Sequence, residues 1–352
     1  MVEKNYDKII TNKDHLNNLK EIVNFLIESN IPFDIDENNQ RIFYLNEGKI
    51  ELRYVDSENH KMGVKKFGIV PMVPNDYFIN ITLKNRENGI TTIWIKDFEA
   101  SEEKTIIDVD GNKIKNYKRK WSCIKSHIKT ITGTIEHRFY ARDCIVKEVP
   151  NNELRPFLET NCFYGYRSAT KNLGLYLKKD KNGHKKGELL IVYTFGHAFY
   201  GKGKYSCEII RVSTKLYCQV IGGASKLLKY FLVNYPTLIM GGKERKMEKI
   251  VFIVDADHNS GNSLQTLGFD FISHKGHGFI NIYTESGITF QRKPLKHKEV
   301  MEQIKNGEVY SVANAGSIIY TLDREEYIKK QNIDVEKSKI KYKKTAFDTV
   351  FK

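Results

Sequence analysis

Residues 208–226 decide the fold that this sequence predicts, and they read Glu208-Ile-Ile-Arg-Val-Ser-Thr-Lys-Leu-Tyr-Cys-Gln-Val-Ile-Gly-Gly-Ala-Ser-Lys226. The apolar start, within Ser206–Ser213, predicts a β-strand, and the glycine pair predicts a turn. An amphipathic helix is expected next, over Gly223–Tyr235, with Leu227, Leu228, Phe231 and Leu232 on one side. The run Lys249–Asp255 is apolar almost throughout, which is typical of a central strand buried on both faces. Strands and helices in this order predict the α/β (α+β) class.

The turn at the glycine pair is suited to a phosphate. Glycines let backbone amides come close to a ligand, and a helix N-terminus adds unpaired N–H groups and the positive end of its dipole. The spacing fits neither GxxxxGK[ST] nor GxGxxG, which are two common phosphate-binding motifs. We expect a pyrophosphate or phosphate here, and the alternative is that the glycines serve only the turn between strand and helix.

Gln219-Val-Ile-Gly222-Gly-Ala224 reads Q-x-x-G-x-A, and the later segment Asn262–Phe269 ends in Leu-Gly-Phe. In this order the two segments resemble the GNAT acyltransferase superfamily, over about residues 140–290. The resemblance implies a mixed β-sheet and acetyl-CoA, or a related acyl-CoA, as cofactor. The implied pyrophosphate site consists of Gln219, Gly222, Gly223, Ala224 and Ser225. The superfamily often has a tyrosine as general acid where this chain has Leu264, so either Tyr283 or Tyr193 replaces it or acyl transfer is absent.

Carboxylates and a tyrosine are the candidate catalytic groups. Asp255 and Asp257 follow the predicted central strand, and the carboxyl ends of strands in open α/β sheets face ligand crevices. Together with Glu208 and Tyr283, they are our candidates for proton transfer. The alternative is that Asn259 or Ser260 caps a helix and that the aspartates are solvated.

The chain carries 57 Lys and Arg against 43 Asp and Glu, a net charge of +14 over 352 residues. Such a charge attracts polyanions, so nucleic acid, most of all double-stranded DNA, is the predicted partner. The alternative is a lysine-rich solvated surface from an AT-biased genome. No apolar run reaches the length of a membrane span and the N-terminus does not read as a signal peptide, which predicts a cytoplasmic protein without a membrane partner. The five cysteines lack CxxC spacing and are expected to be buried thiols.

Seven cations lie within the seventeen residues Lys113–Lys129, with no acid between them. We predict a basic connector over 101–136, because cations neutralise phosphates and aromatic faces stack on exposed bases. Its predicted nucleic-acid contacts are Lys115, Tyr117, Lys118, Arg119, Lys120 and Trp121. The alternative is a solvated linker whose Trp121 packs against one domain.

The N-terminal hundred residues predict a small α/β domain that begins with a helix over residues 11–30. Tyr77–Glu99, and Lys49-Ile-Glu51 followed by His60, resemble the Vsr-like (EDxHD) nuclease domain. The resemblance implies a Mg²⁺-dependent site of which Glu51, His60 and Asp97 or Glu99 remain. Its metal-binding aspartate is missing, since Gln40, Arg41 or Arg53 stands at that position. We therefore expect a degenerate nuclease retained for binding, with Mg²⁺ as a cofactor only if the site is intact.

Several other segments, among them Phe139–Cys144 and Val220–Phe231, resemble phage-encoded proteins whose C-terminal domain accompanies homing nucleases. The same domain resembles the GNAT-like Mom-type DNA modification enzymes. A phage origin would place the protein in the host cell cytoplasm. The predicted organisation is a Vsr-like domain over 1–100, the connector over 101–136, a GNAT-like domain over 137–330 and a lysine-rich tail over 331–352.

Two functions stay open at this point. The first, which we favour, is transfer of an acyl-type group from a CoA donor to a DNA base. The second is a catalytically decayed homing endonuclease that acts as a DNA-binding or regulatory protein, or a Vsr-like Mg²⁺-dependent endonuclease if the N-terminal site is intact. We predict no other metal site.

Overall fold

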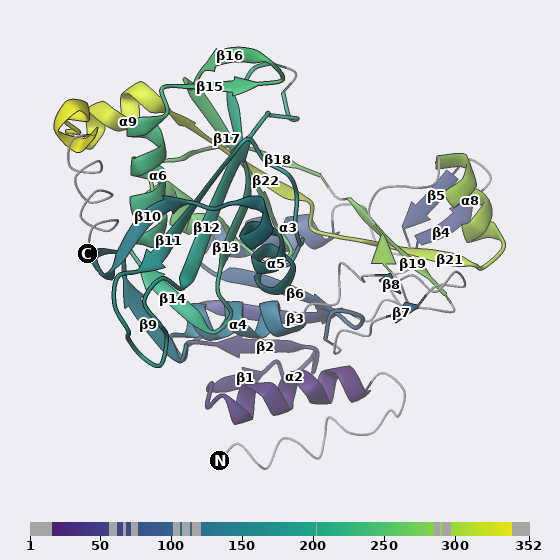
Figure 1. The fold of residues 1–352 in the computed structure, drawn as a ribbon. Helices are drawn as coiled ribbons and strands as arrows, with labels where there is room; N and C mark the ends of the chain where they lie inside the picture. Colours follow the sequence, from purple (N-terminus) through teal and green to yellow (C-terminus); the bar gives the residue numbers. More distant parts are fainter. Residues whose placement is uncertain are drawn as a thin grey trace. The chain divides into compact units, whose positions relative to one another are not determined.

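The computed structural model describes residues 16–55, 62–65, 68–71, 77–100, 106–107, 113–114, 121–201, 203–276, 278–284, 289–290 and 297–339. Helices accompany mixed sheets, so the chain belongs to the α+β class (Figure 1). Its contacts divide it into two compact units. Unit 1 comprises residues 1–134, 255–260 and 274–317, and unit 2 comprises 135–254, 261–273 and 318–352. The predicted boundary at residue 136 lies two residues from the first crossing between the units, whereas no crossing lies near residue 100, and three separate stretches build each unit.

Unit 1 contains a four-stranded sheet of order β1-β2-β3-β6. Its strands are β1 (Phe33–Ile35), β2 (Ile42–Leu45), β3 (Ile50–Val55) and β6 (Thr91–Lys96). The first three run antiparallel, whereas β6 is parallel to β3 and follows α3 (Tyr77–Glu87). Helix α2 (Leu16–Glu28) forms because apolar residues recur on one helical face, which is buried. The buried side chains of α2 are Leu19, Ile22, Val23, Phe25 and Leu26.

Smaller elements complete unit 1. Strand β4 (Met62–Lys65) pairs with β5 (Gly68–Pro71), and β7 (Ile106–Ile107) pairs with β8 (Lys113–Ile114). A three-stranded sheet of order β20-β19-β21 consists of β19 (Phe279–Tyr283), β20 (Thr289–Phe290) and β21 (Val309–Ala313). Helix α8 (His297–Lys305) lies between β20 and β21 in the chain. Phe98 packs with Ile280, Ile282 and Val312 of this sheet.

Part of the predicted connector is a packed helix of unit 1. Helix α4 (Trp121–Thr132) buries Trp121, Ile124 and Ile128, which follow the i, i+3, i+7 spacing of one helical face. The expectation of a solvated connector is therefore wrong for residues 121–132. Lys125 and Lys129 lie off that face, so their charges do not oppose its burial.

Unit 2 contains a seven-stranded mixed sheet of order β10-β11-β12-β13-β17-β22-β18. The strands are β10 (Cys144–Glu148), β11 (Lys171–Leu177), β12 (Leu189–Gly196), β13 (Cys207–Thr214), β17 (Lys249–Asp255), β18 (Asp270–Lys275) and β22 (Ser317–Asp323). The first four are antiparallel neighbours. Strands β13 and β17 are parallel and pair only over Cys207–Ile209 with Ile250–Phe252. A β-bulge leaves Ile210 as an extra residue on β13, because Thr194 pairs with Arg211 and Phe195 pairs with Ile209.

Helices cover both faces of this sheet. Helix α6 (Gly223–Asn234) stacks Phe231 on Phe195 of β12, with ring centres 3.7 Å apart. Helix α5 (Asn151–Asn161) packs Leu154 and Leu158 in a cluster with Val192 of β12. Since side chains alternate along a strand, positions 192 and 195 face opposite sides. Every residue of β12 is accordingly buried.

The remaining elements of unit 2 lie around the sheet. Strand β9 (His137–Tyr140) runs parallel to β14 (Cys218–Ile221), and β15 (Thr237–Met240) pairs with β16 (Lys243–Lys246). The short helices are η3 (Ala141–Asp143), α7 (Asn262–Thr266) and α9 (Arg324–Lys330). The predicted strand at Ser206–Ser213 and helix from Gly223 are confirmed, with the unpredicted β14 between them. Among the described helices, none is long and apolar enough to cross a membrane.

Candidate functional site

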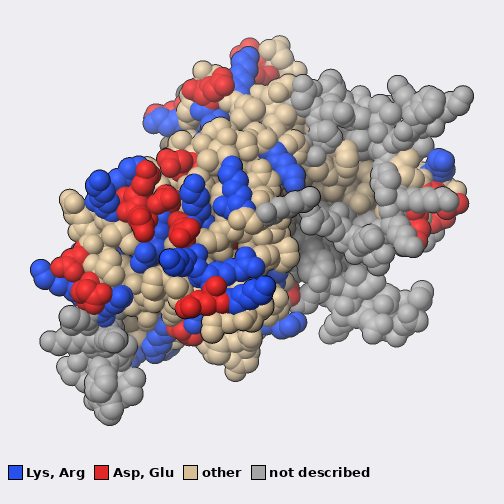
Figure 2. Space-filling view, turned by 90° about the horizontal axis from the view of Figure 1, so that it is seen from above, with Lys and Arg blue, Asp and Glu red and all other residues tan. Residues whose placement is uncertain are grey.

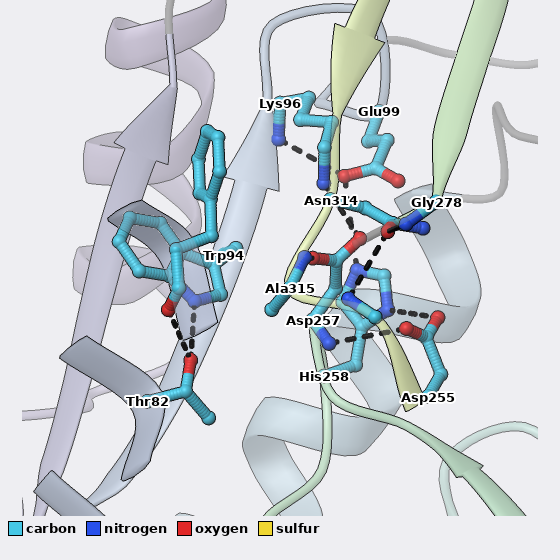
Figure 3. A network of polar contacts seen from close by, with 12 residues as sticks. Thr82, Trp94, Lys96, Glu99, Asp255, Asp257, His258, Gly278, Asn314 and Ala315 are labelled. Atoms are coloured by element: carbon cyan, nitrogen blue, oxygen red, sulfur yellow. Dashed lines mark hydrogen bonds and ion pairs between the residues drawn. The ribbon is translucent and has the colours of Figure 1, made fainter. Parts of the chain in front are cut away.

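The segment Asp255-Ala-Asp-His-Asn-Ser260, which holds two predicted catalytic aspartates, belongs to unit 1. It lies against β6, because the amide of Trp94 donates to the carbonyl oxygen of Asp257 at 2.7 Å. On its other side, the amide of Ala256 donates to the carbonyl oxygen of Gly316 at 3.1 Å. The segment thus places its side chains between β6 and the turn at residues 314–316 (Figure 3).

Asp257 forms an ion pair with Lys96 in the interior of unit 1. The Lys96 Nζ and Asp257 Oδ2 atoms are 2.7 Å apart, and neither side chain has any exposed surface. The other carboxylate oxygen, Oδ1, accepts a hydrogen bond from the amide of Ala315 at 2.7 Å. Burial raises the pKa of Asp257, and the ammonium of Lys96 opposes that rise. A carboxylate so enclosed has no access to a substrate, which corrects the expectation that Asp257 transfers protons.

His258 lies between two carboxylates of the same network. Its Nδ1 is 3.3 Å from Asp255 Oδ2, and its Nε2 is 3.7 Å from Glu99 Oε2. Burial lowers the pKa of His258, but the hydrogen bond to Asp255 and the negative charges of Asp255 and Glu99 outweigh burial and raise the pKa to about 9. The imidazole is therefore charged at neutral pH, and the network contains two cations and three carboxylates.

A second histidine fixes the backbone of this segment. The Nε2 of His127 in α4 donates to the carbonyl oxygen of His258 at 2.9 Å. Burial, followed by the positive charge of His258, lowers the pKa of His127 to about 4, so this ring is neutral. The alternative of helix capping by Asn259 or Ser260 is wrong, because α7 begins after Gly261 and has no side-chain cap. The network around Asp257 and His258 links residues 255–260 to β6 and α4. Its buried side chains are not accessible for proton transfer to a substrate.

The five predicted pyrophosphate residues meet at the β14–α6 turn of unit 2. Gln219 lies in β14, and Gly222 adopts a left-handed conformation with φ of 74° directly before α6. No side chain caps the N-terminus of α6. Ser225, in its first turn, is exposed. We define residues 219–225 as the Gly222 turn, which combines an uncapped helix N-terminus with small side chains.

Both glycines are also required by the turn itself. A Cβ on Gly223 would lie 3.0 Å from Cγ1 of Val220 and 3.3 Å from Cδ1 of Leu175. Gly222 has the positive φ that residues with a side chain rarely adopt. The glycine pair alone is therefore no evidence for a ligand. Whether the turn suits an anion depends on the charges around it.

Lysine side chains bind the loop next to the Gly222 turn. Lys226 Nζ donates to the carbonyl oxygens of Ala141 and Cys144, at 2.7 and 2.6 Å. Lys178 Nζ donates to the carbonyl oxygen of Arg142 at 2.8 Å. The loop around η3, next to the turn, thus collects lysine and arginine side chains. Asp143, also in η3, is bound by Lys181 at 2.5 Å. This local excess of positive charge suits an anion.

The other predicted catalytic groups lie apart along the fold. Glu208 is buried in β13 of unit 2, where its Oε2 accepts a hydrogen bond from the amide of Phe199 at 2.9 Å. Tyr283 ends β19 of unit 1 and is partly exposed. Burial raises the pKa of Tyr193, the possible replacement general acid, far above its usual value. The structure thus joins Asp255 with Asp257 in unit 1, whereas Glu208 belongs to unit 2.

The predicted nucleic-acid residues are described only at Trp121. Its ring is 2 % exposed, its Nε1 donates to Glu21 Oε1 at 2.9 Å, and it packs edge-on against Phe25. The expectation that Trp121 stacks on a base is therefore wrong, and the alternative of packing against one domain is correct for it. Lys115, Tyr117, Lys118, Arg119 and Lys120 lie outside the described residues.

Glu51, which the resemblance to the nuclease domain implies as a metal ligand, forms an ion pair with Arg53 on the same strand, β3. Glu51 is buried, and its Oε1 is bound by the guanidinium of Arg53 and, at 2.7 Å, by Asn85 Nδ2. The Arg53 guanidinium also lies 5.4 Å from the centre of the Trp94 ring. A cation thus occupies the carboxylate that a metal would need. His60 lies outside the described residues, and the described part of the chain holds no group of three or more potential metal ligands.

One arrangement was missed at the sequence level, although its residue types are those of nucleophilic catalysis. His184 Nδ1 is 2.9 Å from Glu188 Oε1, and its Nε2 is 3.9 Å from the sulfur of Cys218. Burial raises the pKa of the Cys218 thiol to about 11, and the residue is 2 % exposed. A nucleophilic cysteine needs an accessible thiolate, so this Cys–His–Glu group is structural.

On the face shown in Figure 2, Lys and Arg side chains lie among Asp and Glu side chains instead of forming one continuous positive field. The net charge of +14 is therefore not gathered into one positive patch on that face. No protein-family model matches this chain, and no curated protein matches it either.

Proposed function

We propose that this chain acts on nucleic acid, and that its unit 2 binds a CoA-type donor and transfers an acyl group to a DNA base. The observation that carries the proposal is the N-terminus of α6. It begins after a left-handed Gly222 and lacks a side-chain cap, and Lys226 and Lys178 donate to carbonyl oxygens of the adjacent loop around η3. Backbone amides at a helix N-terminus bind a pyrophosphate well.

The sheet of unit 2 supports the same proposal. It is mixed, and β13, which precedes β14 and the Gly222 turn in the chain, pairs in parallel with β17 over only three residues. The resemblance to GNAT acyltransferases implies a helix that follows a strand through a glycine pair, as α6 follows β14. The net charge of +14 supports a nucleic-acid acceptor.

The chemistry requires a proton to move. An amine of the base attacks the thioester carbonyl, an amide C–N bond forms as the C–S bond breaks, and the proton of the amine ends on the CoA thiol. A duplex base would have to be flipped out first.

Calorimetry with acetyl-CoA tests donor binding. Ser225→Glu places a carboxylate in the first turn of α6, where it favours the helix dipole but repels a pyrophosphate. We expect binding to the wild-type protein and its loss in this variant without a lower melting temperature. Asn234→Glu is the matched control, because it adds the same charge at the other end of α6. No binding to the wild type at millimolar acetyl-CoA would refute the proposed donor.

Transfer itself is read from the nucleic acid. DNA incubated with the protein, acetyl-CoA and Mg²⁺ is digested to nucleosides and analysed by mass. An acetylated nucleoside that is absent with Ser225→Glu supports the proposal, and shortened DNA without acetylation favours a nuclease.

A second candidate function rests on the Glu51–Arg53 pair. Because a guanidinium binds Glu51, unit 1 matches a decayed nuclease that retains DNA binding. This candidate predicts that duplex DNA binds but is not cut in Mg²⁺ or Mn²⁺. Cleavage that is lost with Glu51→Gln would show that the nuclease site is intact.

A further inference from the structure

Two loops of unit 2 lie together at one end of its sheet. Residues 162–170 precede β11, and residues 197–206 join β12 to β13. Lys171 of β11 pairs with Phe195 of β12, and the amide of Thr170 donates to the carbonyl oxygen of Phe195 at 2.9 Å. The two loops therefore form one continuous surface. We define residues 163–171, 197–201 and 203–205 as the Phe199 surface.

The two loops of this surface combine aromatic rings with cations and contain no acid, although Lys171 at their edge forms an ion pair with exposed Glu148 at 2.6 Å. Residues 162–171 read CFYGYRSATK and residues 196–206 read GHAFYGKGKYS, without a single Asp or Glu. Arginine guanidinium groups lie over its rings. The Arg155 group is 4.3 Å from the centre of the Tyr166 ring, and the Arg211 group is 5.6 Å from that of Tyr164. Lys204 lies 5.6 Å from the centre of the Tyr205 ring.

Phe199 is the most unusual member of the surface. It is 66 % exposed, although a large apolar side chain gains free energy from burial. The Arg167 guanidinium lies 4.6 Å from the centre of its ring, and His197 contacts the ring edge-on. One aromatic ring flanked by cations presents a flat face to solvent together with charges that neutralise phosphate.

The rest of the structure holds both loops in place. Glu208, buried in β13, accepts the amide of Phe199 at 2.9 Å, which fixes one loop. Arg211 fixes the other, since its Nε donates to the carbonyl oxygen of Gly165 at 3.0 Å and its Nη2 donates to that of Tyr164 at 3.4 Å. Two buried or half-buried charges of β13 thus orient an exposed aromatic surface. Glu208, predicted from sequence as a proton carrier, has a positioning role here.

We propose that the Phe199 surface binds single-stranded nucleic acid, with an unpaired base stacked on Phe199 and phosphates beside Arg167 and Lys204. Base stacking on aromatic rings inside a basic groove is how proteins bind single strands without reading sequence. A duplex hides the faces of its bases, so an exposed ring adds nothing to duplex binding. The proposal rests on the proposed function in taking nucleic acid as the partner, but it requires no donor.

The charges of this surface favour nucleic acid over other partners. Acid-free loops with arginine suit a polyanion, and an acidic protein or an anionic membrane shares that property. Interleaved rings and cations form no continuous apolar patch of the kind that membranes and proteins cover. Substitution of Phe199 therefore distinguishes nucleic acid from other polyanions, because only nucleic acid offers a base that can stack on the ring.

Fluorescence anisotropy with a labelled twelve-residue oligo(dT) tests the proposal without acetyl-CoA. Phe199→Ala should weaken binding roughly 5- to 100-fold, the equivalent of about 1–3 kcal/mol for one stacked base. Phe199→Trp should bind like the wild type, because it keeps a ring. Ile239→Ala is the matched control, since Ile239 is 70 % exposed on β15, outside the surface. Arg167→Gln should reduce the salt dependence by about 0.7, as for one phosphate contact to a single strand.

Heparin and vesicles separate the alternatives. Heparin carries charge without bases, so Phe199→Ala should leave its binding unchanged. Equal weakening of heparin and oligo(dT) by Phe199→Ala, or no weakening of either, would overturn the proposal. It would also be overturned if Phe199→Ala removed binding to phosphatidylserine vesicles and left oligo(dT) binding intact. Melting curves of all variants confirm that they are folded.

The outcomes for donor and surface are independent. Ser225→Glu should bind oligo(dT) like the wild type, and Phe199→Ala should bind acetyl-CoA like the wild type. Absent donor binding with a Phe199-dependent oligo(dT) signal would refute the acyl donor and support the surface. Donor binding with an oligo(dT) affinity that ignores Phe199 would refute the surface alone.

Discussion

Lys96 has no exposed side-chain surface, and Asp257 is the carboxylate that compensates its charge at 2.7 Å. Asp257→Asn keeps an acceptor for the amide of Ala315 but leaves the ammonium without a counter-charge. Breaking a buried pair in this way costs about 3–5 kcal/mol. We expect that loss in urea unfolding followed by tryptophan fluorescence. The double variant Lys96→Met/Asp257→Asn should be more stable than Asp257→Asn, and equal stability would show that the two charges are not coupled.

His258 links the stability of unit 1 to pH. Its folded-state pKa of about 9 lies above the ordinary histidine value of about 6.5. Charged His258 therefore stabilises the folded state fully below about pH 6.5, and this contribution is lost as pH rises through about 9. Each unit of difference between the folded and unfolded pKa contributes about 1.4 kcal/mol.

Urea unfolding at pH 6, 7.5 and 9.5 measures this loss. The free energy of unfolding should fall across the series in the wild type. His258→Gln should flatten the fall, and an unchanged slope in that variant would assign the pH dependence to another group.

At the scale of elements, the Gly222 turn depends on two different properties of glycine. Gly222→Ala forces a side chain into a left-handed conformation, which costs about 1–2 kcal/mol. Gly223→Ala instead brings a methyl group to 3.0 Å from Val220 and 3.3 Å from buried Leu175. Overpacking of this kind costs about 1–3 kcal/mol. Thermal melting should show both losses, and Val220→Ala, which removes Cγ1 but keeps a Cβ at 3.1 Å, should restore part of the loss in Gly223→Ala and none of that in Gly222→Ala. Unchanged melting of both glycine variants would indicate that the turn is free to adapt.

The spacing of apolar residues predicted the long helices and strands, because each of them carries its buried face in its own sequence. The strand near Lys249–Asp255 and the helix from Gly223 appear as expected. Periodicity did not predict β14, which exists because β9 lies beside it. Helix α4 was missed since seven nearby cations obscured the spacing of Trp121, Ile124 and Ile128. The apolar run over 308–321 breaks into β21 and β22 at Asn314, whose Oδ1 accepts the amides of Gly278 and Gly316.

The candidate site was predictable only where it is local in sequence. The Gly222 turn lies within seven consecutive residues, so its motif identified it. The partners of Asp257 are Lys96 and Ala315, which are 161 and 58 residues away along the chain. Spacing along the sequence does not predict contacts between such distant residues. A buried, paired aspartate therefore cannot be distinguished from an exposed one by sequence alone. The Phe199 surface was missed for the same reason, because strand register brings its two loops together.

At the scale of the whole molecule, the chain passes between the units after residues 134, 254, 260, 273 and 317. Segment 255–260 follows directly from β17, and β22 begins at Ser317 next to Gly316, which accepts the amide of Ala256. Unit 1 therefore cannot lose its inner segments without releasing the ends of strands of the unit 2 sheet. We predict that the two units unfold together.

The two tryptophans make this prediction testable, because Trp94 and Trp121 are both buried in unit 1. Tryptophan fluorescence reports unit 1 alone, whereas far-ultraviolet circular dichroism reports helices and strands of both units. The two urea transitions should coincide in the wild type, as in a two-state protein. In Asp257→Asn they should shift together to lower urea, since the destabilised network belongs to segments continuous with β17. A fluorescence transition that precedes the dichroism transition would show that unit 1 opens while the sheet of unit 2 persists.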